Sequence, residues 1–364
     1  MPYSEHWNWV NQYEEQHRDN PKVQAVVLLA GRADDALKTA NITLAHDLYY
    51  QAYQQASASN LLELELIYRY YTSQCAMRMQ QSNMIDEAVK IIIKAQNLDI
   101  TTFPWYPFFQ LHLMSMYGAS DPLSYVEETF DACGVLENEY SHNRELISQV
   151  HIRRIYLALA MHDYERAQVF TSTALAYTQG DSYYFATIAE LQGHIYSAKK
   201  DTKSALEYYM LAEKHASSFV ELITVKANSI IYQGNCHLLL KNNTLANQRF
   251  AFAKQLEINY TLALHPSAWF AHMVAEHRYD DILSNICTSI EQYQSFPYVL
   301  LMTYLLEASF LDFLGKPIDK SIQQARETAN QLKTPEAYAD LIDLFATGGS
   351  VFYSWQDIAD AYHN

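Results

Sequence analysis

The sequence contains little cysteine, and what it has does not form a recognisable site. Only four of the 364 residues are cysteines. They lie far apart, each within a helical pattern, at Cys75, Cys133, Cys236 and Cys287. That spacing suits small buried side chains in a reducing compartment better than disulfides or a metal knuckle.

Glycine is also scarce, which excludes nucleotide-binding loops. The nine glycines are scattered, and only Gly348 and Gly349 are adjacent. A Gly-rich phosphate loop therefore has no place in the chain, and a Gly-x-Ser-x-Gly nucleophile elbow is absent too.

Two strings resemble metal-binding motifs but lack the required spacing. His272 and His277 lie five residues apart, whereas zinc hydrolases place two helical histidines four apart. Glu139-x-x-His142 matches half of a di-iron site, and no second pair accompanies it. We therefore expect no metal, no cofactor and no catalytic residue, and hence not an enzyme.

Basic charge and long apolar runs are scarce as well. The 25 Lys and Arg face 41 Asp and Glu, a net charge of −16, and the densest basic runs are the pairs Arg153-Arg154 and Lys199-Lys200. This balance disfavours direct nucleic-acid binding and anionic membranes, and favours neutral or cationic partners. No window approaches 18 uninterrupted apolar residues, and the first twenty residues do not form a signal peptide. We expect a cytoplasmic protein without a membrane span.

What the sequence does contain is a recurring Ala-x-x-x-aromatic-x-x-Ala motif. Offsets of four and seven place all three side chains on one face of a helix, where small Ala lets a neighbouring helix approach and the ring fills the space beside it. Gly193 and Gly234 each lie twelve residues before the first Ala of a copy. The clearest copies are Ala45/Tyr49/Ala52, Ala205/Tyr209/Ala212 and Ala246/Phe250/Ala253.

Weaker copies extend this pattern along most of the chain. The first anchors of successive copies follow at intervals of 43, 37, 42, 38, 41, 36 and 40 residues; they are Ala45, Ala88, Tyr125, Ala167, Ala205, Ala246, Ile282 and Ile322. No strand-like alternation bounded by hairpin turns is present, so the fold is predicted to be all-α. Ser354 to Asp357 reads as a capping box that opens a final helix, which we expect to seal the last helix pair.

The central copies, Gly then aromatic in a first helix and Ala, aromatic, Ala in a second, resemble the tetratricopeptide repeat (TPR). The resemblance covers roughly residues 40–330. It implies a right-handed superhelix of about seven to eight helix pairs, an α-solenoid whose first helices line a concave groove. We expect an N-terminal helical part over 1–100, a repeat array over 101–347 and a capping helix over 348–364.

A looser resemblance is to the Rap and Rgg kind of cytoplasmic peptide-pheromone receptors, which bind short peptides in the groove, often through asparagines. Asn228 and Asn235 could match those asparagines. Residues 1–70 show no convincing helix-turn-helix domain of the Rgg type. Residues 1–100 could supply the helical bundle with which Rap-type members engage a response regulator.

The repeat frame predicts the groove residues, which fall two, five, six and nine places into each unit. Amide side chains donate and accept hydrogen bonds at once, which matches the backbone of an extended peptide. The predicted peptide-binding residues are Gln149, Arg153, Tyr156, Glu190, His194, Asn228, Tyr232 and Asn235.

The sequence thus predicts a non-enzymatic binder of a peptide or protein segment, a candidate quorum-sensing receptor or regulator. We expect a neutral or basic ligand with apolar anchors, whose binding changes the pitch of the superhelix. The alternative is a constitutive scaffold for protein assembly that binds a folded partner through its convex or terminal surfaces. A homodimer is compatible with either.

Overall fold

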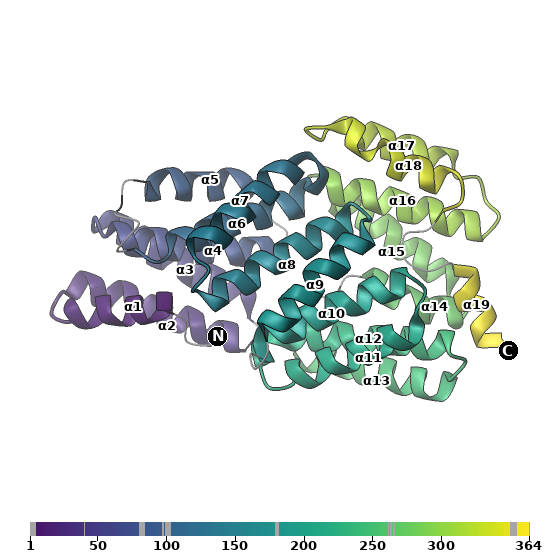
Figure 1. The fold of residues 1–364 in the computed structure, drawn as a ribbon, viewed down its shortest axis with the longest axis horizontal. Helices are drawn as coiled ribbons and strands as arrows, with labels where there is room; N and C mark the ends of the chain where they lie inside the picture. Colours follow the sequence, from purple (N-terminus) through teal and green to yellow (C-terminus); the bar gives the residue numbers. More distant parts are fainter. Residues whose placement is uncertain are drawn as a thin grey trace. The chain divides into compact units, whose positions relative to one another are not determined.

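The computed structural model describes residues 5–39, 41–79, 84–96, 98, 103–178, 182–260, 262, 264, 266–349 and 355–363. Over these ranges the chain forms nineteen α-helices and four short 3-10 helices and contains no strand (Figure 1). The all-α prediction is confirmed. Consecutive helices pack against their neighbours in chain order, as in a helical solenoid. The handedness and number of the repeats stay predictions, as do the boundaries near residues 100 and 347.

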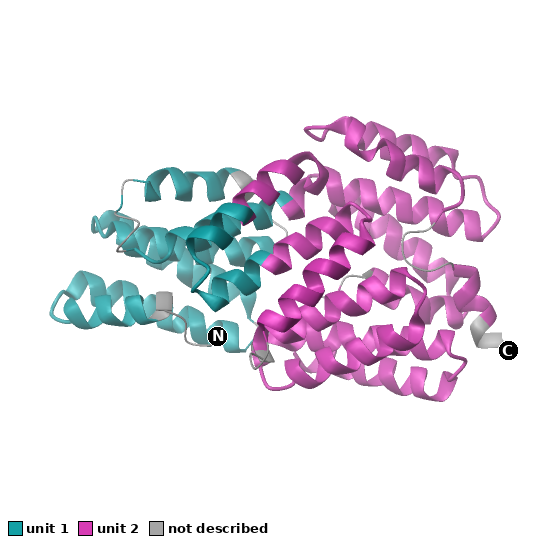
Figure 2. Cartoon of the chain, in the orientation of Figure 1, with its two compact units in different colours: residues 1–117, 134–150 teal, residues 118–133, 151–364 magenta. Residues whose placement is uncertain are grey.

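The chain divides into two compact units (Figure 2). Unit 1 comprises residues 1–117 and 134–150. Its core surrounds the buried rings of Tyr49, Tyr68 and Trp105. Its helices are α1 (Glu5–Gln16), α2 (Pro21–Lys38), α3 (Ile42–Ala58), α4 (Leu62–Arg78), α5 (Met84–Ala95), most of α6 (Tyr106–Ser120), the end of α7 (Val126–Glu139) and the start of α8 (Arg144–Ala160).

Unit 2 comprises residues 118–133 and 151–364. It holds the rest of α6, α7 and α8 and the clearest repeats. Its further elements are η1 (Pro122–Tyr125), α9 (Tyr164–Tyr177), α10 (Ser182–Ala198), α11 (Thr202–Ala216), η2 (Val220–Leu222), α12 (Ile223–Leu239), α13 (Asn243–Asn259), η3 (Pro266–Trp269), α14 (Phe270–Ala275), α15 (Tyr279–Gln292), α16 (Pro297–Phe313), α17 (Asp319–Ala329), η4 (Pro335–Tyr338), α18 (Ala339–Ala346) and α19 (Trp355–His363).

The turn inside each central helix pair has the same backbone geometry. One residue adopts a left-handed conformation, with φ between 56° and 61°, directly before the residue that caps the second helix. These residues are His162, Lys200, Lys241 and His277, at intervals of 38, 41 and 36 residues. The intervals equal those predicted from the Ala anchors, so the register of the pairs α8/α9, α10/α11, α12/α13 and α14/α15 is confirmed.

The capping residues explain where the second helices begin. In three of the four turns a side-chain oxygen accepts a hydrogen bond from the backbone N–H three residues later, which satisfies a donor that the first helical turn leaves unpaired. Asp163 accepts from the Arg166 N–H at 3.0 Å, Asp201 accepts from the Ser204 N–H at 3.2 Å, and Asn242 accepts from the Leu245 N–H at 3.4 Å.

The repeat glycines bring the two helices of a pair into close contact. A Cβ atom built on Gly193 would lie 2.5 Å from the ring of Tyr209, and one on Gly234 would lie 2.5 Å from the ring of Phe250. Neither ring is more than 1% exposed. The predicted role of the motif as packing between helices is therefore confirmed in both pairs.

Two segments of unit 2 that lie far apart in sequence are joined by a polar contact that we call the clasp, formed by residues 121–125 with residues 333–338. The Tyr338 hydroxyl donates to Asp121 at 2.6 Å and accepts from the Leu123 N–H at 3.2 Å. The Lys333 N–H donates to the other Asp121 oxygen at 2.9 Å. Because the partners lie more than 200 residues apart in sequence, the clasp closes the run of helix pairs in unit 2 upon itself.

The final helix packs on more than the last helix pair. Its principal contacts are with α12, α14 and α16, the first helices of three successive pairs. Trp355, Ile358 and Ala359 are buried in the same core as Phe270 and Phe310, and the Trp355 indole N–H donates to Ser309 at 3.0 Å. Ser354, the first residue of the predicted capping box, lies outside the described residues.

Candidate functional site

The predicted groove residues come from three successive first helices. Arg153 and Tyr156 lie in α8, Glu190 and His194 in α10, and Asn228, Tyr232 and Asn235 in α12, all within unit 2. Gln149, one turn before Arg153 in α8, belongs to unit 1, so its place relative to the other seven is left open.

Glu190 links the three helices. It is only 6% exposed, and Asn228 of α12 donates a hydrogen bond to its carboxylate. Burial raises the pKa of Glu190 to about 8, and the bond from Asn228 opposes that rise only in part. No ion pair of Glu190 occurs in the described part of the chain. Its carboxyl group is therefore largely protonated at neutral pH and has no counter-charge.

Tyr156 is the exposed member of the group. Its surface is 46% exposed, yet the protein around it desolvates its hydroxyl and raises its pKa to about 12. The charge of the Glu190 carboxylate adds to this rise in the pKa of Tyr156, and the charge of Arg153 opposes it. The three side chains therefore lie close enough to interact electrostatically.

His194 and Tyr232 form the apolar part of the site. Their rings meet edge to face with centroids 4.6 Å apart, and Nδ1 of His194 is hydrogen bonded to the Tyr209 hydroxyl at 2.9 Å. Burial lowers the pKa of His194 to about 4, so the imidazole is neutral at physiological pH. The site thus combines a protonated acid, a neutral imidazole, an amide and two tyrosine rings.

Asn235 is less accessible than we expected for a ligand contact. It is 4% exposed, and neither its amide oxygen nor its amide nitrogen has a hydrogen-bond partner. In two other pairs the residue fifteen places before the motif tyrosine bonds to that tyrosine's hydroxyl: Asp34 with Tyr49 and His194 with Tyr209. Asn235 stands fifteen places before Phe250, which has no hydroxyl.

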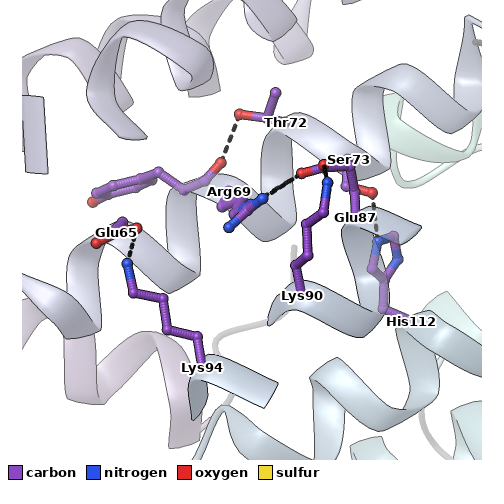
Figure 3. A network of polar contacts seen from close by, with 9 residues as sticks. Glu65, Arg69, Thr72, Ser73, Glu87, Lys90, Lys94 and His112 are labelled. Carbon is purple, nitrogen blue, oxygen red and sulfur yellow. Dashed lines mark hydrogen bonds and ion pairs between the residues drawn. The ribbon is translucent and has the colours of Figure 1, made fainter. Parts of the chain in front are cut away.

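The polar side chains of α4, α5 and α6 form a second network, in unit 1 (Figure 3). Glu87 accepts from Arg69 at 2.7 Å and from Lys90 at 2.7 Å. Figure 3 also shows Lys94 directed at Glu65. His112 completes the network through hydrogen bonds to Ser73 at 2.7 Å and to Gln74 at 2.9 Å. Because these groups satisfy one another, we assign this network to helix packing.

The other candidate chemistry has ordinary structural roles. His272 stacks on Phe250 with centroids 4.2 Å apart and pairs with Glu276 at 3.3 Å, while His277 lies in the following turn. No group of three His, Cys, Asp or Glu in the described residues is placed to hold a metal ion. None of the four cysteines, all of which lie in the described residues, forms a disulfide, and Cys287 is exposed, which corrects the expectation that each is buried.

Sequence reasoning missed two features of the site. The first is the hydrogen bond of the motif tyrosine: His194 has the Tyr209 hydroxyl as a partner, whereas Asn235 has none because Phe250 lacks a hydroxyl. The separation of fifteen residues between the two positions is the signal in the sequence that could have indicated this bond. The position of α19 on α12, α14 and α16 had no signal, since no local pattern shows which helices a terminal segment contacts.

A comparison with protein-family models finds no match, and none of the curated proteins matches the chain. Among the described helices, none combines the length and apolar character needed to cross a bilayer.

Proposed function

We propose that unit 2 binds a peptide or protein segment along its first helices, with a basic group of the ligand placed at Glu190. The observation that carries the proposal is the contact of α19 with α12, α14 and α16. This face already accepts a nine-residue helix of the chain's own, anchored by Trp355. A surface that buries a short amphipathic segment within one chain has the chemistry to bind such a segment from another.

The polar contacts of the proposed binding surface come from α8, α10 and α12, the first helices of the preceding pairs. Tyr156 offers an accessible ring, and Asn228 can donate and accept hydrogen bonds toward a peptide backbone. Glu190 is a buried acid without counter-charge, so a lysine or arginine of the ligand would stabilise its ionised form and release its proton. The net charge of −16 also attracts ligands that carry basic groups.

The resemblance to Rap and Rgg receptors supports a regulatory role for such binding. In this proposal the ligand changes the spacing of the helix pairs and so what the helices of unit 1 present to a partner. A constitutive scaffold would instead hold its partner without using the groove residues.

Calorimetry with a library of short basic and neutral peptides tests the proposal. We expect Glu190→Gln and Asn228→Ala each to weaken the best peptide by about tenfold, the loss of roughly one charged hydrogen bond. Glu207→Gln, an exposed acid on α11, is the matched control and should leave the affinity unchanged. Proton release measured in buffers of different ionisation enthalpy should disappear in Glu190→Gln.

Two results would count against the groove. One is that no peptide of the library binds. The other is that a partner captured by the intact protein is retained by the double variant Glu190→Gln, Asn228→Ala, which is the behaviour of a scaffold that uses another surface.

A further inference from the structure

A pocket in unit 1, remote in sequence from the groove residues, has the composition of a cation site. Its volume is about 350 Å³, within the range of small-molecule sites. The segment from α1 contributes Trp9, Tyr13, two glutamines and His17, which directly follows the helix, and Glu63 of α4, Leu98 and Phe103 complete the wall.

Three aromatic rings line one side of the pocket. Trp9 and Tyr13 lie one helical turn apart with centroids 5.1 Å apart and planes inclined by 30°. Phe103 stands nearly perpendicular to Trp9, at 78° and 5.2 Å. Phe103 is buried, whereas Trp9 and Tyr13 are half-buried and keep part of their surface open. Tyr13 also contacts the imidazole of His17, with centroids 4.5 Å apart. The three aromatic rings therefore form one contiguous cluster at a corner of the pocket.

Glu63 supplies a negative charge to this corner. It is half-buried, and in the described part of the chain it forms no ion pair or hydrogen bond, whereas Glu65, two residues later, pairs with Lys94. Glu63 lines the same pocket as Tyr13, and its charge contributes, after burial, to raising the pKa of the Tyr13 hydroxyl.

We propose that this pocket binds an organic ammonium group. Ring faces attract cations through their quadrupoles, and a carboxylate adds Coulombic attraction, whereas an inorganic cation would require several oxygen ligands that the rings do not provide. The two glutamines of α1, Gln12 and Gln16, can accept hydrogen bonds from substituents of the ligand. The ammonium group belongs either to a small quaternary amine or to a methylated lysine side chain.

Choline and its neutral isostere 3,3-dimethyl-1-butanol separate a cation site from a merely apolar one. We expect choline to bind the full-length protein at millimolar concentration or below, measured by calorimetry, and the isostere to bind at least about tenfold more weakly, since cation–π and carboxylate attraction together exceed about 1.4 kcal/mol. The affinity of Nα-acetyl-trimethyllysine amide is compared with that of choline to identify the source of the ammonium group. Tighter binding of the lysine derivative indicates a methylated lysine side chain, and tighter binding of choline indicates a small amine.

Glu63→Gln should weaken choline by about tenfold while leaving the isostere unchanged, and Glu15→Gln, an exposed acid on the same helix α1, should change neither. Glu63→Gln preserves the size of a half-buried side chain, so we expect the variant to keep the fold. Equal affinity for choline and the isostere, or binding that is insensitive to Glu63→Gln, would overturn the assignment, as would the absence of binding by any cation.

Discussion

The hydroxyl of the motif tyrosine is the residue-scale feature that most affects the candidate site. In the α10/α11 pair it fixes His194, and the matching bond in the α2/α3 pair fixes Asp34. The α12/α13 pair carries Phe250 at this place, which leaves a buried amide without a partner at Asn235. A buried polar group without a hydrogen bond costs about 1–3 kcal/mol, so this pair is locally less stable than its neighbour.

Phe250→Tyr should therefore stabilise the protein. The added hydroxyl would reach Asn235 as the hydroxyl of Tyr209 reaches His194, and we expect a gain of about 1 kcal/mol in the free energy of unfolding in urea. The same substitution in an Asn235→Ala background should give no gain. An equal gain in both backgrounds would show that the hydroxyl does not bond to Asn235.

Gly193→Ala should destabilise unit 2. The new Cβ atom would lie 2.5 Å from the Tyr209 ring, which is locked by packing, and overpacking of this kind costs about 1–3 kcal/mol. Gly31→Ala is the control, because a Cβ atom at Gly31 meets nothing within 4 Å. There, inside α2, we expect a gain of about 0.5–1 kcal/mol from reduced backbone freedom. Thermal or urea unfolding of both variants gives the comparison.

The pKa of Glu190 predicts how stability depends on pH. The folded protein keeps the Glu190 proton up to about pH 8, whereas the unfolded chain releases it near the ordinary value of 4.5. The folded state therefore binds more protons between these values, and stability falls as pH rises, by at most about 1.4 kcal/mol per pH unit. His194 acts in the opposite direction, but only between its folded value of about 4 and its ordinary value of 6.5.

Urea unfolding from pH 6.5 to pH 8 isolates the contribution of Glu190. We expect the wild-type protein to lose stability over this range relative to Glu190→Gln, which cannot titrate. Parallel curves for the two proteins would mean that Glu190 is ionised in the folded state.

At the scale of elements, the helix pairs are defined by local chemistry. Three features recur in the central pairs: a residue in the left-handed conformation, a side chain that caps the second helix, and the contact of a repeat glycine with an aromatic ring. Each depends on residues close in sequence. The spacing of the motif residues made the register predictable, and the left-handed residues recur at the same intervals. The α14/α15 turn shows the limit, because Arg278 occupies the capping place without a side-chain cap.

Helix α19 is the element whose position depends most on tertiary contacts. A nine-residue helix is not stable alone in water, so it depends on burial of Trp355, Ile358 and Ala359 against three other helices. Trp355→Ala should release it and lower the free energy of unfolding by about 3 kcal/mol or more. Gln356→Ala, on the exposed face, should change it by less than about 0.5 kcal/mol. Proteolysis of the C-terminal segment should accelerate in the first variant and not in the second.

At the scale of the whole molecule, the clasp determines whether unit 2 is an open or a closed array. Its bonds join residues 210 to 217 places apart. Solenoids whose ends are free can change pitch along their whole length, whereas a closed array must break or strain a contact to do so. The change of pitch proposed for ligand binding would therefore have to act on the clasp.

Tyr338→Phe should loosen this closure. It removes the hydroxyl that bonds to Asp121 and Leu123 at once, for which we expect a loss of about 1–3 kcal/mol and a larger radius of gyration in small-angle scattering. Tyr260→Phe, at a partly exposed ring of α13's C-terminal end, is the matched control and should change neither quantity. An unchanged radius together with unchanged stability would show that the clasp does not hold the ends together.

The sequence by itself determined the helical class and the register of the central pairs, because both depend on spacings within or between adjacent repeats. The tertiary structure alone decided the burial of Asn235, the position of α19 and the clasp. Each of these depends on how small rotations between successive pairs add up over the array, and on contacts between residues far apart in sequence, which no local pattern encodes.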